Sequence, residues 1–308
     1  MKIVFLDTDT LGDVDSLDQF NEYGEVFFYP FTQLDERLER VLDADVVFTN
    51  KVLIDQYIID NCPQLKFVGV LATGTNNVDL DYAASKGIEV KNVSGYSTES
   101  VAQHTFSLLL ALIHQTAFYS NYVSEQYSDS PIFTHLSRPY FELKGKVMGI
   151  IGLGNIGRRV AYLAEAFGMK VCYYSTSGKN TTKDYQQLSF VDLLRTSDVI
   201  SIHAPLNDNT ISLIGNKELL LMKKSAFLLN NGRGGIVNEK ELFQALENQQ
   251  IAGAALDVFQ NEPLEKESLL HIKKDNLILS PHIAWASLEA RNELMRLSLE
   301  NLKSFLKK

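Results

Sequence analysis

The chain has 308 residues, of which 45% are hydrophobic and 22% charged, as in an ordinary globular protein. Its net charge of −9 argues against nucleic acid or an anionic membrane surface as the main partner. No apolar run approaches the roughly 18 residues of a membrane span, and the N-terminal run is too short for a secretory signal. The only cysteines, Cys62 and Cys172, lack metal-ligand spacing, so we expect a reduced, cytoplasmic protein without a metal site.

The first third of the chain alternates short apolar runs with helical patterns, which predicts a mostly parallel, doubly wound sheet. The expected strands are Ile3–Leu6, Val26–Tyr29, Val46–Thr49, Phe67–Leu71 and Ile88–Val93, and the expected helices are Leu34–Leu42, Leu53–Asn61 and Val78–Lys86. The loop after the fourth strand follows its carboxyl end, where open sheets bind ligands. Its backbone amides and hydroxyls could hold a substrate carboxylate, which gives Leu71, Ala72, Thr73 and Gly74 as candidate contacts. An ordinary polar loop is the alternative.

The middle of the chain begins with one long helical pattern, from Thr98 to Tyr122. The next stretch, from Glu125 to Gly145, is polar and aromatic and contains two prolines. An irregular segment of that length usually has a task, such as a subunit contact. Its aromatic residues could pack on a partner chain or could equally cover the protein's own core.

A second alternating series follows from Lys146 and ends in an amphipathic helix, Ser287–Leu306. Its expected strands are Val147–Ile151, Lys170–Ser175, Asp198–His203, Ala226–Asn230, Ala252–Val258 and Leu277–Ser280. Its expected helices are Arg158–Phe167, Leu188–Arg195, Asn216–Met222 and Glu239–Asn248.

The motif Gly152-x-Gly154-x-x-Gly157 lies between the first strand and the first helix of this second series. In that context Gly152 permits a tight turn, Gly154 lets the backbone approach a pyrophosphate, and Gly157 lets helix and strand pack closely. The helix N-terminus would then face the phosphates. A glycine-rich turn without a ligand is the alternative.

The motif begins only at residue 152, which places the dinucleotide domain in the middle of the chain, at about 98–284. Residues 1–97 and 285–308 would then form a second, substrate domain. The chain would cross twice between the domains, which predicts a hinge and a cleft.

Three charged residues, Arg233, Glu262 and His282, each follow a strand of the second series. Reduction of a 2-keto acid needs a carboxylate anchor, a hydride donor and a proton donor. A planar guanidinium suits the anchor, imidazolium suits the proton donor, and a carboxylate beside the imidazolium would stabilise its charge. Individually, a surface histidine or a Glu-Pro turn would be an ordinary feature, so the shared placement carries the argument.

These stretches together make the chain similar, over essentially its full length, to the D-isomer-specific 2-hydroxyacid dehydrogenases. The matching segments are Leu71-Ala-Thr-Gly-Thr-Asn-Asn-Val-Asp79, Ser97-Thr-Glu-Ser-Val-Ala-Gln103, Gly149–Gly157, His203-Ala-Pro-Leu206 with Thr210, Asn231-Gly-Arg-Gly-Gly235, Ala255-Leu-Asp-Val-Phe259 with Glu262-Pro263, and Ser280-Pro-His-Ile-Ala-Trp-Ala286. The resemblance implies that Arg233 binds substrate, that His282 is the acid/base and that Glu262 pairs with it. It also implies a homodimer built through the dinucleotide domain and cofactor contacts at Thr73, Asn155, Ile156, His203, Pro205, Thr210, Asn231, Gly232 and Asp257.

Within that family the chain most resembles glycerate dehydrogenases, also called hydroxypyruvate reductases, through segments such as Thr49-Asn-Lys51 and Pro281–Trp285. Formate dehydrogenases of the superfamily carry glutamine where Glu262 stands, which disfavours that activity. D-lactate or another 2-keto acid remains an alternative substrate. A dinucleotide-sensing, corepressor-like binding protein is the alternative outside enzymes.

One position departs from the usual NAD pattern. The strand after the glycine motif leads to Ser175, where NAD enzymes usually have an acidic residue that binds the ribose 2′-hydroxyl. Ser175, Thr176, Ser177 and Lys179 could hold a 2′-phosphate, although this segment contains no arginine. We therefore expect NAD or NADP as cofactor, with a weak or reversed preference for NAD.

Overall fold

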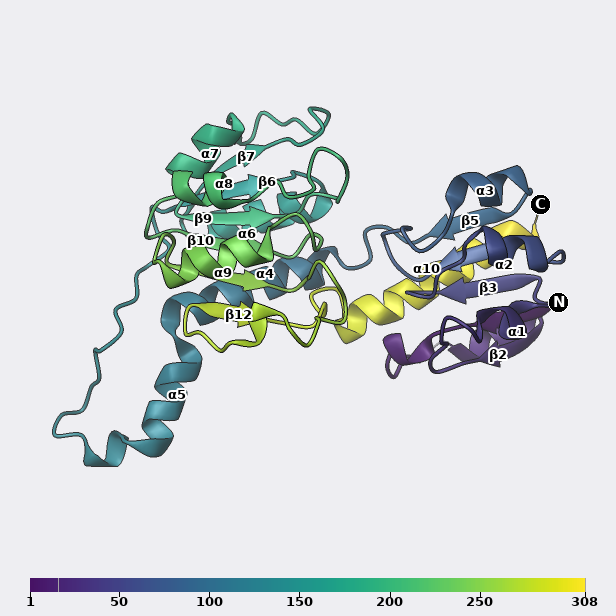
Figure 1. Ribbon diagram of the computed structural model, residues 1–308, viewed down its shortest axis with the longest axis horizontal. Helices are drawn as coiled ribbons and strands as arrows, with labels where there is room; N and C mark the ends of the chain where they lie inside the picture. Colours follow the sequence, from purple (N-terminus) through teal and green to yellow (C-terminus); the bar gives the residue numbers. More distant parts are fainter. Residues whose placement is uncertain (16, 308) are drawn as a thin grey trace. The chain divides into compact units, whose positions relative to one another are not determined.

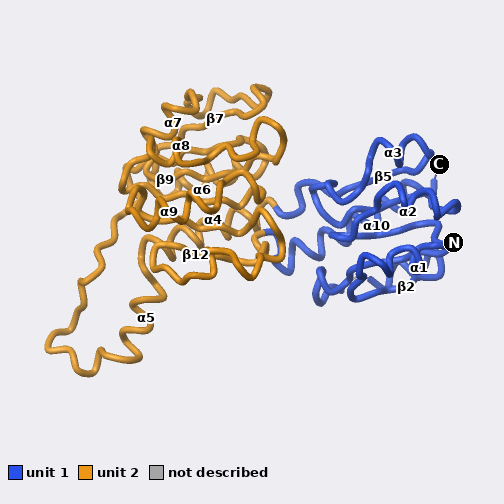
Figure 2. The backbone as a smooth tube through the Cα atoms, in the orientation of Figure 1, with its two compact units in different colours: residues 1–97, 285–308 blue, residues 98–284 orange. Residues whose placement is uncertain are grey.

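The chain folds into two compact units, 1–97 with 285–308 and 98–284, coloured separately in Figure 2. The computed structural model describes residues 1–15 and 17–307. Each unit is an α/β fold around one fully parallel sheet (Figure 1), as the alternation of strands and helices predicts. No helix among the described residues is long and apolar enough to cross a membrane.

The first unit has a five-stranded sheet in the order β2-β1-β3-β4-β5. Its core lies on both faces of the sheet, with the helices α1–α3 on one face and α10 on the other. The strands are β1 (Lys2–Phe5), β2 (Glu25–Phe28), β3 (Val46–Thr49), β4 (Phe67–Val70) and β5 (Glu89–Asn92), and the helices are α1 (Arg37–Val41), α2 (Gln56–Asn61), α3 (Leu80–Ser85) and α10 (Leu288–Leu306), with 3₁₀ turns at Thr8–Thr10 and Leu17–Tyr23.

The first-unit helices α1–α3 are shorter at their N-termini than their apolar patterns predict. For α2 and α3 the reason is a cap: the carboxylates of Asp55 and Asp79 accept the amides of Ile58 and Tyr82 and so fix where each helix begins. Apolar residues upstream of the cap, such as Leu53, then belong to the preceding loop.

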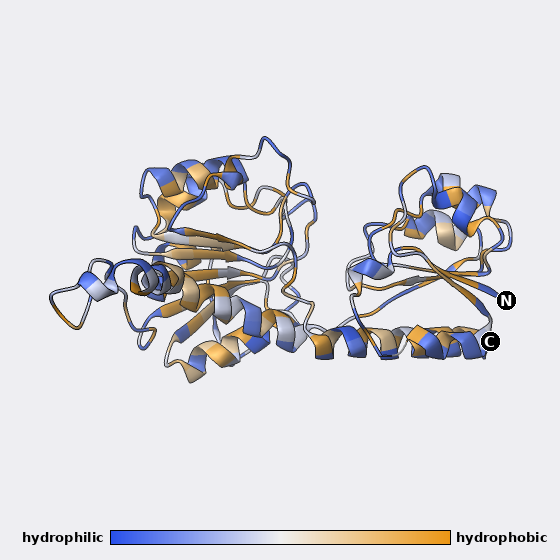
Figure 3. Ribbon diagram, turned by 90° about the horizontal axis from the view of Figure 1, so that it is seen from below, coloured by the Kyte–Doolittle hydropathy of each residue, from blue (hydrophilic) through white to orange (hydrophobic). Residues whose placement is uncertain are grey.

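The second unit has a seven-stranded sheet in the order β12-β11-β10-β9-β6-β7-β8. Helices α7–α9 cover one face and α4 and α6 the other, and Figure 3 shows hydrophobic strands between partly hydrophilic helices. The strands are β6 (Val147–Ile151), β7 (Lys170–Tyr174), β8 (Gln186–Gln187), β9 (Val199–Ile202), β10 (Phe227–Asn230), β11 (Gly253–Leu256) and β12 (Leu277–Leu279). The helices are α4 (Thr98–His114), α5 (Thr116–Glu125), α6 (Asn155–Ala166), α7 (Phe190–Thr196), α8 (Asn216–Leu221) and α9 (Glu239–Glu247), with 3₁₀ turns at Tyr127–Asp129 and Leu269–His271.

The order of these strands places the glycine motif. Strand β6 has β7 on one side and β9 on the other, so successive connections from β6 run to opposite sides of the sheet. Such a switch point is where doubly wound sheets bind ligands at the carboxyl ends of their strands. The turn after β6 lies at that point.

The single helix expected from Thr98 to Tyr122 is wrong in one respect: it is two helices. Gln115 adopts a left-handed conformation (φ 51°), which ends α4 and starts α5 in a new direction. Helix α5 and the segment to about residue 140 then project from the rest of the unit (Figure 1). We call residues 116–140 the arm.

Candidate active site

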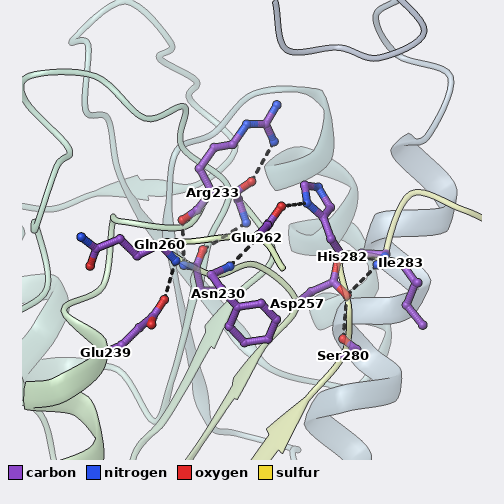
Figure 4. A network of polar contacts seen from close by, with 12 residues as sticks. Asn230, Arg233, Glu239, Asp257, Gln260, Glu262, Ser280, His282 and Ile283 are labelled. Atoms are coloured by element: carbon purple, nitrogen blue, oxygen red, sulfur yellow. Dashed lines mark hydrogen bonds and ion pairs between the residues drawn. The ribbon is translucent and has the colours of Figure 1, made fainter. Parts of the chain in front are cut away.

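Arg233, Glu262 and His282 follow β10, β11 and β12, which are neighbours in a parallel sheet. Their loops therefore emerge at one edge of the second unit, and Figure 4 shows the three side chains in one neighbourhood there. The placement expected from sequence is the one observed.

The imidazole of His282 is held by a carboxylate. Its Nδ1 lies 2.7 Å from Oε2 of Glu262, and the two side chains are 24% and 31% exposed. The other Glu262 oxygen accepts the amide of Phe259 at 3.0 Å. A carboxylate fixed at both oxygens keeps a proton on Nδ1 and leaves Nε2 as the ring nitrogen that can exchange a proton with a ligand.

His282 itself sits in a left-handed conformation (φ 54°), an uncommon state for a residue other than glycine. Its amide donates to the carbonyl of Asp257 at 2.8 Å. The buried carboxylate of Asp257 accepts the amides of Ile283 (2.9 Å) and Ala284 (2.8 Å) and the hydroxyl of Ser280 (2.6 Å). These bonds hold the turn that carries His282.

The ionisation of Asp257 follows from the same contacts. Burial alone would raise its pKa, but hydrogen bonds from His104, Ser280 and the two backbone amides outweigh that effect and lower the pKa. Asp257 is thus a fixed negative charge beneath the histidine turn.

The turn that carries Arg233 is held by Asn230. The side-chain amide of Asn230 donates to the carbonyl of Arg233 (2.9 Å), and its oxygen accepts the amide of Gly232 (3.1 Å). Within the described residues, the guanidinium of Arg233 donates one hydrogen bond, to the Gly232 carbonyl at 2.8 Å, and the residue is only half-buried. Its remaining donors suit a carboxylate.

Gly234 brings the arginine turn against the glutamate turn. A Cβ at this position would overlap the carbonyl group of Phe259, the residue whose amide holds Glu262. Only glycine allows that approach. The sequence alone does not mark four supporting residues, Gly234, Asn230, His104 and Ser280. All but His104 lie in the Gly-rich and Ser-Pro-His segments that contain Arg233 and His282.

The glycine motif fits a dinucleotide. Gly152 has a positive φ (92°), and a Cβ there would lie 2.8 Å from the amide nitrogen of Ala204. At Gly157 a Cβ would overlap the carbonyl oxygen of Gly152. At Gly154, by contrast, a Cβ would meet none of the described residues within 4 Å apart from its own chain neighbours, so there is open space in front of this turn for a ligand.

The other expected cofactor contacts have mixed surroundings. Asn155 and Pro205 are exposed. Ile156 is half-buried against the core, and Gly232 is buried next to Arg233. The hydroxyl of Thr210 is used within its own loop, by the carbonyl of Pro205 (2.7 Å) and the amide of Asn207 (2.8 Å). Among the described residues, three buried side-chain atoms here lack a hydrogen-bonding partner: Oγ of Ser175, Nδ1 of His203 and Oδ1 of Asn231.

Unpartnered buried polar atoms are costly unless a ligand satisfies them, so these three atoms favour a polar ligand at this edge. Burial also lowers the pKa of His203 to about 3, which keeps its imidazole neutral. Its Nε2 lies 2.8 Å from the hydroxyl of Ser201, and Nδ1 remains available.

The expected substrate contacts from Leu71 to Gly74 belong to the first unit, after β4. The side chain of Leu71 lies in the core of that unit, and its amide donates to Thr49 at 2.8 Å. Thr73 is exposed, and its carbonyl accepts Nδ2 of Asn92. A ligand would therefore meet backbone and Thr73 rather than the leucine side chain. No cluster of three or more metal-ligating side chains is found among residues 1–15 and 17–307.

Comparison with known proteins decides the family. Residues 106–284 match the NAD-binding domain of D-isomer-specific 2-hydroxyacid dehydrogenases. The chain belongs to this family. It is accordingly an NAD(P)-dependent oxidoreductase of 2-hydroxyacids.

Relatives within the family span the whole chain. A hydroxypyruvate reductase of Blautia hydrogenotrophica is 39% identical over 100% of this chain and 97% of its own length. A glycerate dehydrogenase of Methylorubrum extorquens is 36% identical over 99% and 96%. Among solved structures, an NADPH-dependent glyoxylate/hydroxypyruvate reductase of Sinorhizobium meliloti in complex with NADP and malonate has a TM-score of 0.85, with 28% identity over 99% and 93%.

Proposed function

We propose that this dehydrogenase reduces small 2-keto acids, chiefly hydroxypyruvate and glyoxylate, to the corresponding 2-hydroxy acids. The observation that carries the proposal is the Glu262–His282 pair beside the Arg233 turn. The names of the relatives supply the substrate class: hydroxypyruvate reductase, glycerate dehydrogenase and glyoxylate/hydroxypyruvate reductase.

The three residues divide the work of the reduction. Arg233 binds the substrate carboxylate and polarises the keto oxygen with its remaining N–H donors. His282 donates a proton from Nε2 to that oxygen as it becomes an alkoxide, while Glu262 holds the ring through Nδ1. The reduced nicotinamide, when bound, supplies the hydride.

The glycine turn after β6 and the loops after β7 and β9 would hold the dinucleotide, with His203, Asn231 and Ser175 supplying the unpartnered polar atoms. Within the first unit, the loop Leu71–Gly74 follows the carboxyl end of β4, and its Thr73 hydroxyl and backbone amides suit a carboxylate.

A homodimer is also part of the proposal. Ile132, Phe133, Leu136 and Tyr140 of the arm are 57–89% exposed. Large apolar side chains gathered in this way favour a protein interface. The arm keeps a defined shape, since Tyr122 stacks on His135 with ring centroids 3.8 Å apart and Arg138 bonds to Asp275 at 2.7 Å.

Oxidation of NADH and NADPH by the purified full chain, measured with hydroxypyruvate, glyoxylate, pyruvate and a branched 2-keto acid, tests the proposal. We expect the highest kcat/KM with hydroxypyruvate or glyoxylate. A preference for pyruvate or the branched acid would assign another substrate. Absence of turnover with all four, together with capture of a protein partner, would favour a dinucleotide-sensing role instead.

A further inference from the structure

The segment that follows β7 lies against an arginine from another element. Nη2 of Arg158, in the first turns of α6, donates to the carbonyl of Thr181 at 3.2 Å. The sequence places no arginine between Ser175 and Asp184, and this contact brings one there from the helix that the glycine motif starts.

Arg158 has no acidic partner in the part of the chain that the structure describes. Among residues 1–15 and 17–307, the neutral Thr181 carbonyl is the one hydrogen-bonding partner described for its side chain, and the residue is half-buried. Its neighbour Arg159 differs, because Glu99 binds its Nε at 2.8 Å. A guanidinium has five N–H donors, so most of those on Arg158 remain for an anion.

Two carboxylates of this part of the unit, Glu165 and Asp184, have hydrogen-bonding partners of their own. Glu165 accepts the hydroxyl of Tyr185 at 3.1 Å, and Asp184 accepts the hydroxyl of Thr182 at 2.7 Å. The segment itself also contributes Lys179 and Lys183. In a chain with a net charge of −9, this is a local concentration of positive charge.

Ser175 supplies the second, independent observation. It is 7% exposed, and its hydroxyl has no partner among the described residues. The carbonyl of the preceding residue, Tyr174, accepts the amide of Gly152 at 3.0 Å, so Ser175 stands directly beside the glycine turn. If the alternation of β7 continues by one residue, Ser175 shares the sheet face of Tyr173, which packs with α6.

We infer that Ser175 and Arg158 form the binding site for the 2′-phosphate of NADP, and that the enzyme prefers NADP(H) to NAD(H). In a NAD-preferring site a carboxylate after the second strand accepts the ribose hydroxyl and repels a 2′-phosphate. Here a hydroxyl replaces the carboxylate, and a guanidinium reaches the same segment from α6. The inference rests on the proposed function only for the binding of the dinucleotide, not for the choice of keto acid.

The adenosine half of the cofactor tests this without turnover. Isothermal titration calorimetry of the full chain measures its affinities for adenosine 2′,5′-bisphosphate and for 5′-AMP. These two ligands differ only in the 2′-phosphate. We expect the bisphosphate to bind at least about 10-fold more tightly, because charged hydrogen bonds of this kind each contribute on the order of a 10- to 100-fold change in affinity.

Two variants and one control sharpen the test. Arg158→Gln should lower the affinity for the bisphosphate by about 10- to 100-fold and leave the affinity for 5′-AMP within about twofold of the unsubstituted chain. Ser175→Asp should reverse the preference. Arg159→Gln, an arginine one position along the same helix, should change neither affinity, and the melting temperature of each variant checks its folding.

Three outcomes would overturn the inference. The unsubstituted chain could bind 5′-AMP as tightly as the bisphosphate or more tightly. Arg158→Gln could lower the affinity for both ligands equally, or could leave both affinities unchanged. An equal loss would assign Arg158 to the 5′-phosphate instead. Since no keto acid is present, a failure here is separate from a failure of the proposed substrate class.

Discussion

Glu262 holds His282 through a 2.7 Å contact between Oε2 and Nδ1, while the other oxygen of the same carboxylate is held by the amide of Phe259. The imidazole is therefore oriented by a group that is itself fixed to the backbone. The arrangement separates two roles, since Nδ1 is used within the protein and Nε2 is the nitrogen left for the substrate.

Removal of the histidine should remove the proton donor. We expect His282→Ala to lower kcat by about 10²- to 10⁴-fold, the usual contribution of general acid–base catalysis. Glu262→Gln should cause a smaller loss and should change the pH profile of kcat/KM, because the ring loses its anionic partner but keeps a hydrogen-bonding one. Steady-state kinetics with hydroxypyruvate from pH 5 to pH 9 measures both.

The control is Glu265→Gln, a nearby exposed glutamate outside the pair. Unchanged kinetics in His282→Ala would refute the assignment of His282 as proton donor.

Arg233 should affect both binding and rate. Arg233→Ala is expected to raise KM and lower kcat, with a loss in kcat/KM of roughly 10²- to 10³-fold for a charged hydrogen-bonded pair. Arg233→Lys should recover only part of this, since lysine keeps the charge without the planar fork. Arg195→Ala, on the exposed surface of α7, is the matched control. An unchanged KM in Arg233→Ala would show that another residue binds the substrate carboxylate.

Asp257 should couple stability to pH. Its pKa in the folded chain is below the ordinary value, so its stabilising effect is present above the unfolded pKa of about 3.9 and is lost as the pH falls through the lower, folded value. Asp257→Asn should lower the free energy of unfolding at pH 7 by about 1–3 kcal/mol, because an amide N–H would face the amide of Ala284.

Urea unfolding of the full chain at pH 7 and below pH 4 measures this effect. The difference between wild type and variant should shrink at the lower pH, whereas Asp208→Asn, in an exposed loop, should match the wild type at both. A difference that does not change with pH would show that the carboxylate charge is not what stabilises the turn.

The sequence sufficed for the features that depend on periodicity and on strand order. The apolar runs locate the strands, and a parallel sheet brings the loops after β10, β11 and β12 to one edge. The sequence alone therefore predicts that Arg233, Glu262 and His282 lie together.

Features that depend on one backbone conformation or on a contact between distant elements could not be found in this way. The apolar pattern continues through Gln115, and only its left-handed conformation separates α4 from α5. The two-residue strand β8, Gln186–Gln187, has no apolar run to mark it. Likewise, the approach of Arg158 to Thr181 joins a helix to a loop 23 residues away and has no local signal.

The arm should decide the oligomeric state. Replacing Phe133 and Leu136 with serine removes two apolar side chains that are 89% and 80% exposed in the single chain. We expect the double variant to shift from dimer toward monomer, with dimer affinity weakened by at least about 100-fold. Sedimentation velocity over a range of concentrations measures the shift.

Leu220→Ser is the matched control, since Leu220 is 60% exposed on α8, away from the arm. A monomeric wild type, or a double variant that stays dimeric, would contradict the role of the arm.

Two glycines of one motif should separate folding from cofactor binding. At Gly157 a Cβ would overlap the carbonyl oxygen of Gly152, so Gly157→Ala should force α6 away from β6 and lower the melting temperature by several degrees. At Gly154 the backbone is extended (φ −80°, ψ −163°) and the Cβ position is open, so Gly154→Ala should melt within about one degree of the wild type.

The methyl group added by Gly154→Ala would nevertheless occupy the space in front of the turn, where the pyrophosphate approaches. We therefore expect Gly154→Ala to weaken NADH and NADPH binding by about 10-fold or more while leaving the fold intact. Scanning calorimetry and cofactor fluorescence titration on both variants measure these effects. Unchanged cofactor affinity in Gly154→Ala would show that the glycine turn does not bind the dinucleotide.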